Sequence, residues 1–145
     1  MARSFGLRAK LNFITYIHDI EAPVGKNAPN RRDDVLLVQY LIAVWMAHEK
    51  DIQKLLPIIQ VTPNMKIDGI CGEKTHANIK AFETFHHPSV NIDGIITPVF
   101  RVNGNNKMFL LNQIFAFAGG LKSDPTINPP AVIQFPLELL NSLYR

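Results

Sequence analysis

One cysteine and five histidines are the residues of this chain best suited to nucleophilic chemistry. Cys71 lies shortly before His76, and a thiolate activated by a neighbouring imidazole is a common nucleophile. However, Cys71 also lies in the turn-like run Gly69-Ile70-Cys71-Gly72, where a small packed side chain is expected. We therefore interpret Cys71 as a structural residue, and a single cysteine allows no internal disulfide.

A zinc site would have to draw on the same side chains together with His86 and His87. These residues lack the paired spacing of zinc ligands. His86 and His87 are adjacent, so on a helix they would point about 100° apart. We expect neither a metal ion nor another cofactor.

Two aspartates are candidates for the paired carboxylates that cleave glycosidic bonds. Each precedes a glycine and is flanked by isoleucines, in Ile67-Asp68-Gly69-Ile70 and in Ile92-Asp93-Gly94-Ile95. Asp-Gly favours a tight turn, because the carboxylate accepts a backbone N–H and glycine reaches positive φ. The isoleucines are expected to point inward. We interpret the following as structural turn residues, with no catalytic residue and no enzymatic activity: Asp68, Gly69, Gly72, Asp93 and Gly94.

The first turn leads into a helix. Gly72 gives the backbone the conformational freedom to start it, and Glu73 places negative charge at the positive N-terminal end of the helix dipole. A helical wheel places five residues on one core-facing stripe: Thr75, Asn78, Ile79, Phe82 and Phe85. It places three towards the opposite side: Lys74, Lys80 and Glu83.

Two further helices are predicted around this one. Asp33 or Asp34 is expected to cap the first, which runs to about Glu49 and is apolar on two sides, so an extension of the chain should cover one of them. The last, over residues 107–118, is closed by Gly119-Gly120. It is apolar nearly all round and should be the most buried element.

The predicted fold is a single, mainly α domain over residues 1–145. Its three-helix core, with the two Asp-Gly turns, covers about residues 33–119. The N-terminal extension (1–32) and the C-terminal extension (120–145) add a short two-stranded ribbon and a terminal helix over 137–143. The ribbon would pair a strand within 11–20 with residues 131–135.

Composition excludes several classes of protein. The net charge is +3 for 15 Lys/Arg and 12 Asp/Glu. Residues 1–32 hold six basic and two acidic residues (+4), which leaves nine and ten (−1) for the rest. The centre is therefore no basic platform, and no nucleic-acid-binding motif is recognisable. No apolar run approaches the ~20 residues of a membrane span. With no signal peptide recognised, we expect a cytoplasmic protein as synthesised, or one delivered to the periplasm or cell wall by a signal-independent route.

Residues 34–98 resemble the peptidoglycan-binding-domain-like family, a small three-helix module of bacterial cell-wall proteins. The family pattern has a Leu-Gln helix, an Asp-Gly turn, Gly-x-x-Thr opening a helix that ends in Phe-Gln, and a second Asp-Gly turn. The corresponding places here are Val38-Gln39, Asp68-Gly69, Gly72 to Thr75, Phe82-Glu83 and Asp93-Gly94. Asn78 and Glu83 depart from the pattern, as do the longer link after the first helix and the delayed third helix.

The resemblance implies a non-catalytic peptidoglycan-binding module, linked to a phage or a contractile secretion system. The alternative is a cytoplasmic protein-interaction module, such as an accessory or immunity protein of a cell-wall-directed toxin. A small cell-wall hydrolase is the third hypothesis. Sugars are recognised by aromatic faces and polar groups. Five such residues are predicted to rim a groove between the first two helices and bind the ligand: Gln39, Tyr40, Asn78, His86 and Asn91.

Overall fold

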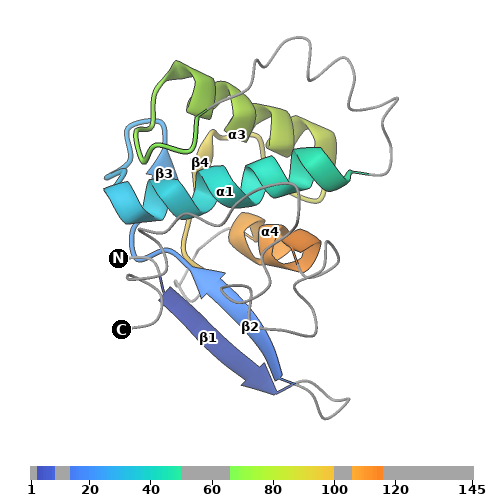
Figure 1. Cartoon of the computed structure of the whole chain (residues 1–145). Coiled ribbons are helices and arrows are strands. Elements are labelled where there is room, and N and C mark those ends of the chain that lie inside the picture. Colours follow the sequence, from blue (N-terminus) through green and yellow to red (C-terminus); the bar gives the residue numbers. More distant parts are fainter. Residues whose placement is uncertain (1–2, 9–13, 50–65, 100–105, 116–145) are drawn as a thin grey trace.

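The computed structural model describes residues 3–8, 14–49, 66–99 and 106–115 (Figure 1). These residues form a mainly α fold with short antiparallel strands, as predicted. The elements in chain order are β1 (Arg3–Arg8), β2 (Ile14–Asp19), β3 (Val24–Gly25), α1 (Arg32–His48), α3 (Glu73–His86), β4 (Ile95–Ile96) and α4 (Lys107–Phe115).

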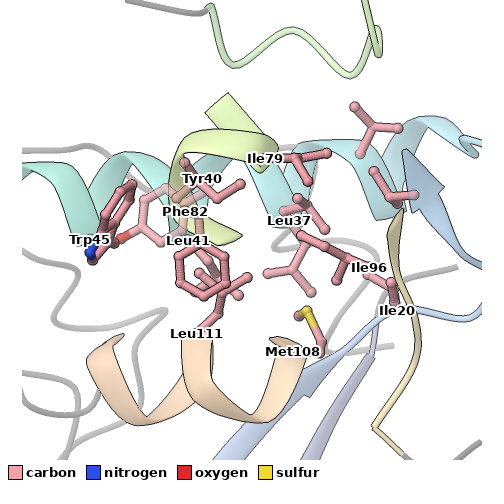
Figure 2. Packing of buried hydrophobic residues seen from close by; sticks show 14 of the residues in the cluster. Ile20, Leu37, Tyr40, Leu41, Trp45, Ile79, Phe82, Ile96, Met108 and Leu111 are labelled. Atoms are coloured by element: carbon pink, nitrogen blue, oxygen red, sulfur yellow. The ribbon is translucent and has the colours of Figure 1, made fainter. Parts of the chain in front are cut away.

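Helix α1 lies between α3 and α4, which explains why it is apolar on two sides (Figure 1). The side chains of Leu37, Leu41 and Trp45 are at most 1% exposed. Their neighbours in Figure 2 include Phe82 of α3 and Leu111 of α4. An extension of the chain was expected to cover the second apolar side of α1. Within the described residues, α4, the third core helix, covers most of that side.

The start of α1 differs from the prediction. Arg31 is the N-cap residue and makes no side-chain capping hydrogen bond, while Asp33 and Asp34 lie inside the first turn. The buried Asp34 carboxylate instead accepts the backbone N–H groups of Glu21 (3.0 Å) and Ala22 (3.1 Å). Asp34 therefore ties the preceding loop to the helix. The prediction that Asp34 caps the helix is wrong, because its carboxylate oxygens accept two N–H groups of the loop.

Strand β2 lies within the predicted strand region and pairs with β1, from Arg3 opposite Asp19 to Arg8 opposite Ile14. The pairing of β2 with β1 was not predicted, and residues 131–135 and 137–143 lie outside the described part. A second ribbon pairs Val24 with Ile96 and Gly25 with Ile95.

Asn112 of α4 attaches that helix to the end of β2. Its Oδ1 accepts the His18 N–H (2.7 Å), and its Nδ2 donates to the His18 carbonyl (2.8 Å). Next to this contact, Asp19 Oδ1 accepts the Val99 N–H (2.8 Å). The Asn112 amide therefore ties β2 to α4, and the Asp19 carboxylate ties β2 to the segment after β4.

Two burial predictions are wrong. Glu83 was expected on the outer side of α3 but is fully buried, because it serves the second Asp-Gly turn. Helix α4 was expected to be the most buried element, yet Phe109 is 43% exposed, and α1 occupies the centre instead. The predicted end of α4 at residues 118–120 lies outside the described residues.

Candidate functional site

The first Asp-Gly turn is held by Gln39, which reaches it from α1. Gln39 Oε1 accepts the N–H groups of Asp68 (3.1 Å) and Gly69 (2.9 Å). Gln39 Nε2 lies within hydrogen-bond distance of the Ile70 carbonyl (3.0 Å) and Thr75 Oγ1 (2.9 Å). A buried amide is suited to this position because it both donates and accepts.

The turn itself has the geometry that its sequence predicts. Gly69 has a φ of +78°, and Asp68 Oδ1 accepts the Ile70 N–H (2.9 Å). This hydrogen bond lowers the pKa of Asp68, with a further contribution from Gln39. Asp68 is therefore negatively charged at neutral pH.

The second Asp-Gly turn is held in the same way by Glu83 of α3. Both Glu83 carboxylate oxygens lie within 3.0 Å of the Gly94 nitrogen, and Oε2 also accepts the Asp93 N–H (3.3 Å). Gly94 has a φ of +75°, and Asp93 Oδ1 accepts the Ile95 N–H (3.0 Å). In each turn, one polar side chain of an earlier helix thus accepts the backbone N–H groups of the Asp-Gly pair.

Lys107 of α4 compensates the charge of Glu83. Its buried ammonium pairs with the carboxylates of Glu83 and Asp93 and donates to the Ile95 carbonyl (2.8 Å). Burial raises the pKa of Glu83, and the hydrogen bond from Lys107 opposes that rise. Burial also acts to raise the pKa of Asp93, but Lys107 and the Ile95 N–H outweigh it and lower that pKa.

A groove with a volume of about 410 Å³ opens beside the first turn. Among the described residues, its lining combines both signs of charge with the apolar side chain of Ile70: Lys66, Asp68, Ile70, Gly72, Glu73, Lys74 and Thr75. Ile70 is 65% exposed, although isoleucines beside the turns were expected to point inward. Ile92 beside the second turn is 48% exposed, so that expectation is wrong at both positions, where the turn directs the side chain outward.

Three of the five predicted ligand-binding residues lie in the interior. Gln39, Tyr40 and Asn78 are each fully buried. Gln39 forms hydrogen bonds with the first turn. The Tyr40 ring packs edge-on against the Phe115 ring, with 5.9 Å between their centroids. Asn78 Nδ2 donates to the Lys74 carbonyl (2.7 Å). The structure therefore gives all three a packing or bonding role in the core.

The other two predicted residues lie away from the groove lining. His86 is half-buried at the end of α3. Its ring centroid lies 5.5 Å from that of Trp45 and 4.6 Å from that of Phe82. Asn91 is exposed beside the second turn. The predicted set is thus not gathered at one surface, and the groove is formed instead by residues of the first turn and the start of α3.

Cys71 is a half-buried free thiol whose pKa is raised by burial, opposed by a hydrogen bond with the Gly25 backbone. A raised pKa disfavours the reactive thiolate. Within the described ranges, no cluster of three or more His, Cys, Asp or Glu residues could hold a metal ion. Nor does any helix of the described part have the length and apolarity to cross a membrane.

A scan against protein-family models, a search of curated proteins and a search of solved structures each found no match to this chain.

Proposed function

We propose that this chain is a non-catalytic binding module for peptidoglycan, acting in a phage or contractile-secretion setting. The observation that carries the proposal is the attachment of both Asp-Gly turns to helix side chains. Gln39 and Glu83 stand where the pattern of peptidoglycan-binding-domain-like proteins has its two glutamines. Their hydrogen bonds to the Gly69 and Gly94 N–H groups give that pattern a physical reason.

The groove beside the first turn is the surface that we assign to the ligand. Its volume of about 410 Å³ falls in the range of small-ligand sites, roughly 300–1,000 Å³. Its lining residue Asp68 is held by Gln39 of the central helix, so the groove is largely formed before a ligand arrives. Preorganisation of this kind lowers the entropic cost of binding.

A second candidate function is recognition of a protein partner, such as a cell-wall-directed toxin. Exposed Ile70 favours it, because an apolar side chain that is 65% exposed beside a groove suits a protein interface. In this reading the same groove accepts a side chain of the partner.

Sedimentation with purified sacculi separates these functions. The peptidoglycan module predicts that the protein sediments with the sacculi, is displaced by soluble muropeptides and releases none itself. Failure to sediment, together with direct binding to a purified toxin, would favour the second function. Muropeptide release that disappears in Asp68→Asn or Asp93→Asn would overturn the non-catalytic assignment.

A further inference from the structure

Resting on the proposed function, we propose that the groove beside the first turn recognises the peptide stem of peptidoglycan and not its glycan strand. The ligand class is a short peptide that carries free carboxylates, a free amine and small apolar side chains. Three properties of the groove lead to this ligand.

The first property is that, among the residues that the structure describes, no aromatic ring lines the groove. Sugar recognition commonly uses a ring face together with hydrogen-bonding groups. The large aromatic side chains of Tyr40, Trp45 and Phe82 are fully buried in the core. The described lining of the groove therefore offers a pyranose no ring on which to stack.

The second property is charge of both signs. Lys66 and Lys74 line the groove together with Asp68 and Glu73. Within the part of the chain that the structure describes, Lys66, Glu73 and Lys74 take part in no ion pair. Lys66 lies close enough to Asp68 to help lower the pKa of that carboxyl, while the charges of Glu73 and Lys74 face the groove for a ligand. A stem peptide presents carboxylates to the lysines and the amine of its diamino acid to the acidic groups. The sugars without their peptide carry a lactyl carboxylate on each muramic acid but no amine for the acidic groups.

The third property is Ile70, whose exposed side chain lies among these charges. The methyl groups of alanine residues in a stem peptide can cover part of that surface, which contributes about 25 cal/mol per Å² of apolar area. Open space beside Gly72, where an added Cβ would meet no atom within 4 Å, leaves room for the peptide backbone.

Two probes test the inference by calorimetric titration: the free tetrapeptide L-Ala-γ-D-Glu-meso-diaminopimelate-D-Ala, and glycan chains stripped of peptide by an amidase. The tetrapeptide is expected to bind, more weakly at higher salt because exposed charges are screened. The stripped glycan offers the lysines only lactyl carboxylates and offers Asp68 and Glu73 no amine, so it is expected to bind much more weakly than the tetrapeptide.

Two variants of exposed lysines on α3 form a matched pair. Lys74→Glu reverses a charge in the groove and is expected to weaken tetrapeptide binding by up to about fivefold, as for the loss of one exposed ion pair. Lys80 is exposed and is not among the described lining residues, so Lys80→Glu should leave the affinity for the tetrapeptide unchanged. Circular dichroism of both variants checks that they fold.

The outcomes separate the inference from the function on which it rests. Sedimentation with sacculi combined with binding of stripped glycan, but not tetrapeptide, overturns the inference and leaves the peptidoglycan module standing. Equal loss in the two lysine variants also overturns it, because the groove would then hold no specific contact. No association with sacculi overturns the proposed function itself.

Discussion

Gly69 and Gly94 have nearly the same backbone conformation but different surroundings. Their φ angles are +78° and +75°. A Cβ added at Gly69 would lie 2.8 Å from Arg32 Cγ and 3.1 Å from the Arg32 carbonyl oxygen, whereas at Gly94 the nearest atom is Lys26 Cβ at 3.9 Å. The two turns therefore share a conformational requirement, and only the first adds a steric one.

Alanine at either position should lower the free energy of unfolding, with the larger loss at Gly69. The shared cost of the left-handed conformation is about 1–2 kcal/mol, and the contact with Arg32 adds to it in Gly69→Ala only. Urea denaturation of both variants measures the difference. Equal losses would show that the close approach of Arg32 does not constrain the first turn.

His86 should contribute to a dependence of stability on pH just below neutrality. It lies against the rings of Trp45, Phe82 and Phe85, and its Nδ1 is 2.9 Å from the Phe82 carbonyl oxygen. Burial lowers the pKa of His86 below its ordinary value of 6.5, while the Phe82 carbonyl and the Glu49 charge oppose that shift. The folded protein thus favours neutral imidazole.

Because the unfolded chain binds a proton more readily at this residue, the contribution of His86 to stability is complete above pH 6.5. It should be lost as the pH falls through the lower pKa of the folded state. Unfolding experiments between pH 7 and pH 5 should show a flatter pH dependence for His86→Phe than for the natural sequence. His87→Gln, at the exposed neighbouring position, is the control and should retain the natural slope.

At the scale of elements, Gln39 joins α1 to the first turn through hydrogen bonds in both directions. Gln39→Met keeps a side chain of similar length but leaves the Asp68 and Gly69 N–H groups without their acceptor. We expect a loss of about 2 kcal/mol or more, since an unsatisfied buried group costs about 1–3 kcal/mol. Gln113→Met on the exposed side of α4 should change stability by less than about 0.5 kcal/mol.

The second turn uses charge where the first uses a neutral amide. Removing Lys107 in Lys107→Met leaves Glu83 buried without its counter-ion, which typically costs about 3–5 kcal/mol. Adding Glu83→Gln removes the buried charge and keeps an oxygen that can accept the Gly94 N–H. Chemical denaturation should therefore find the double variant more stable than Lys107→Met alone. A double variant as unstable as the single one would contradict this assignment.

At the scale of the whole molecule, the mainly α fold and the geometry of both Asp-Gly turns were predictable. The Asp-Gly pair strongly prefers a tight turn. The segments of α1 and α3 carry apolar residues at helical spacing, which predicts helices packed in a core. The partner of β2 was not predictable, because β1 is a short basic segment with little alternation. Burial of Glu83 was missed because its two partners, the second Asp-Gly turn and Lys107, contact it only in the folded chain.

The candidate groove was predictable only in part. Asp68 and Gly72 were identified as turn residues, but Lys66, Ile70 and Lys74 join them only once the turn is folded against α3. Conversely, Gln39 and Tyr40 have the side chains expected of a binding site, yet the packing of α1 between two helices buries both. Residue type alone does not distinguish an amide that binds a ligand from one that binds its own chain.

Mapping of the bound surface by NMR tests most directly whether the first turn is the ligand site. Titration of ¹⁵N-labelled protein with soluble muropeptides should shift the amide signals of Ile70, Gly72 and Lys74, while those of Ile92 and Gly94 at the second turn stay in place. Shifts confined to the second turn, or no shifts at muropeptide concentrations that displace the protein from sacculi, would contradict the assignment of the groove.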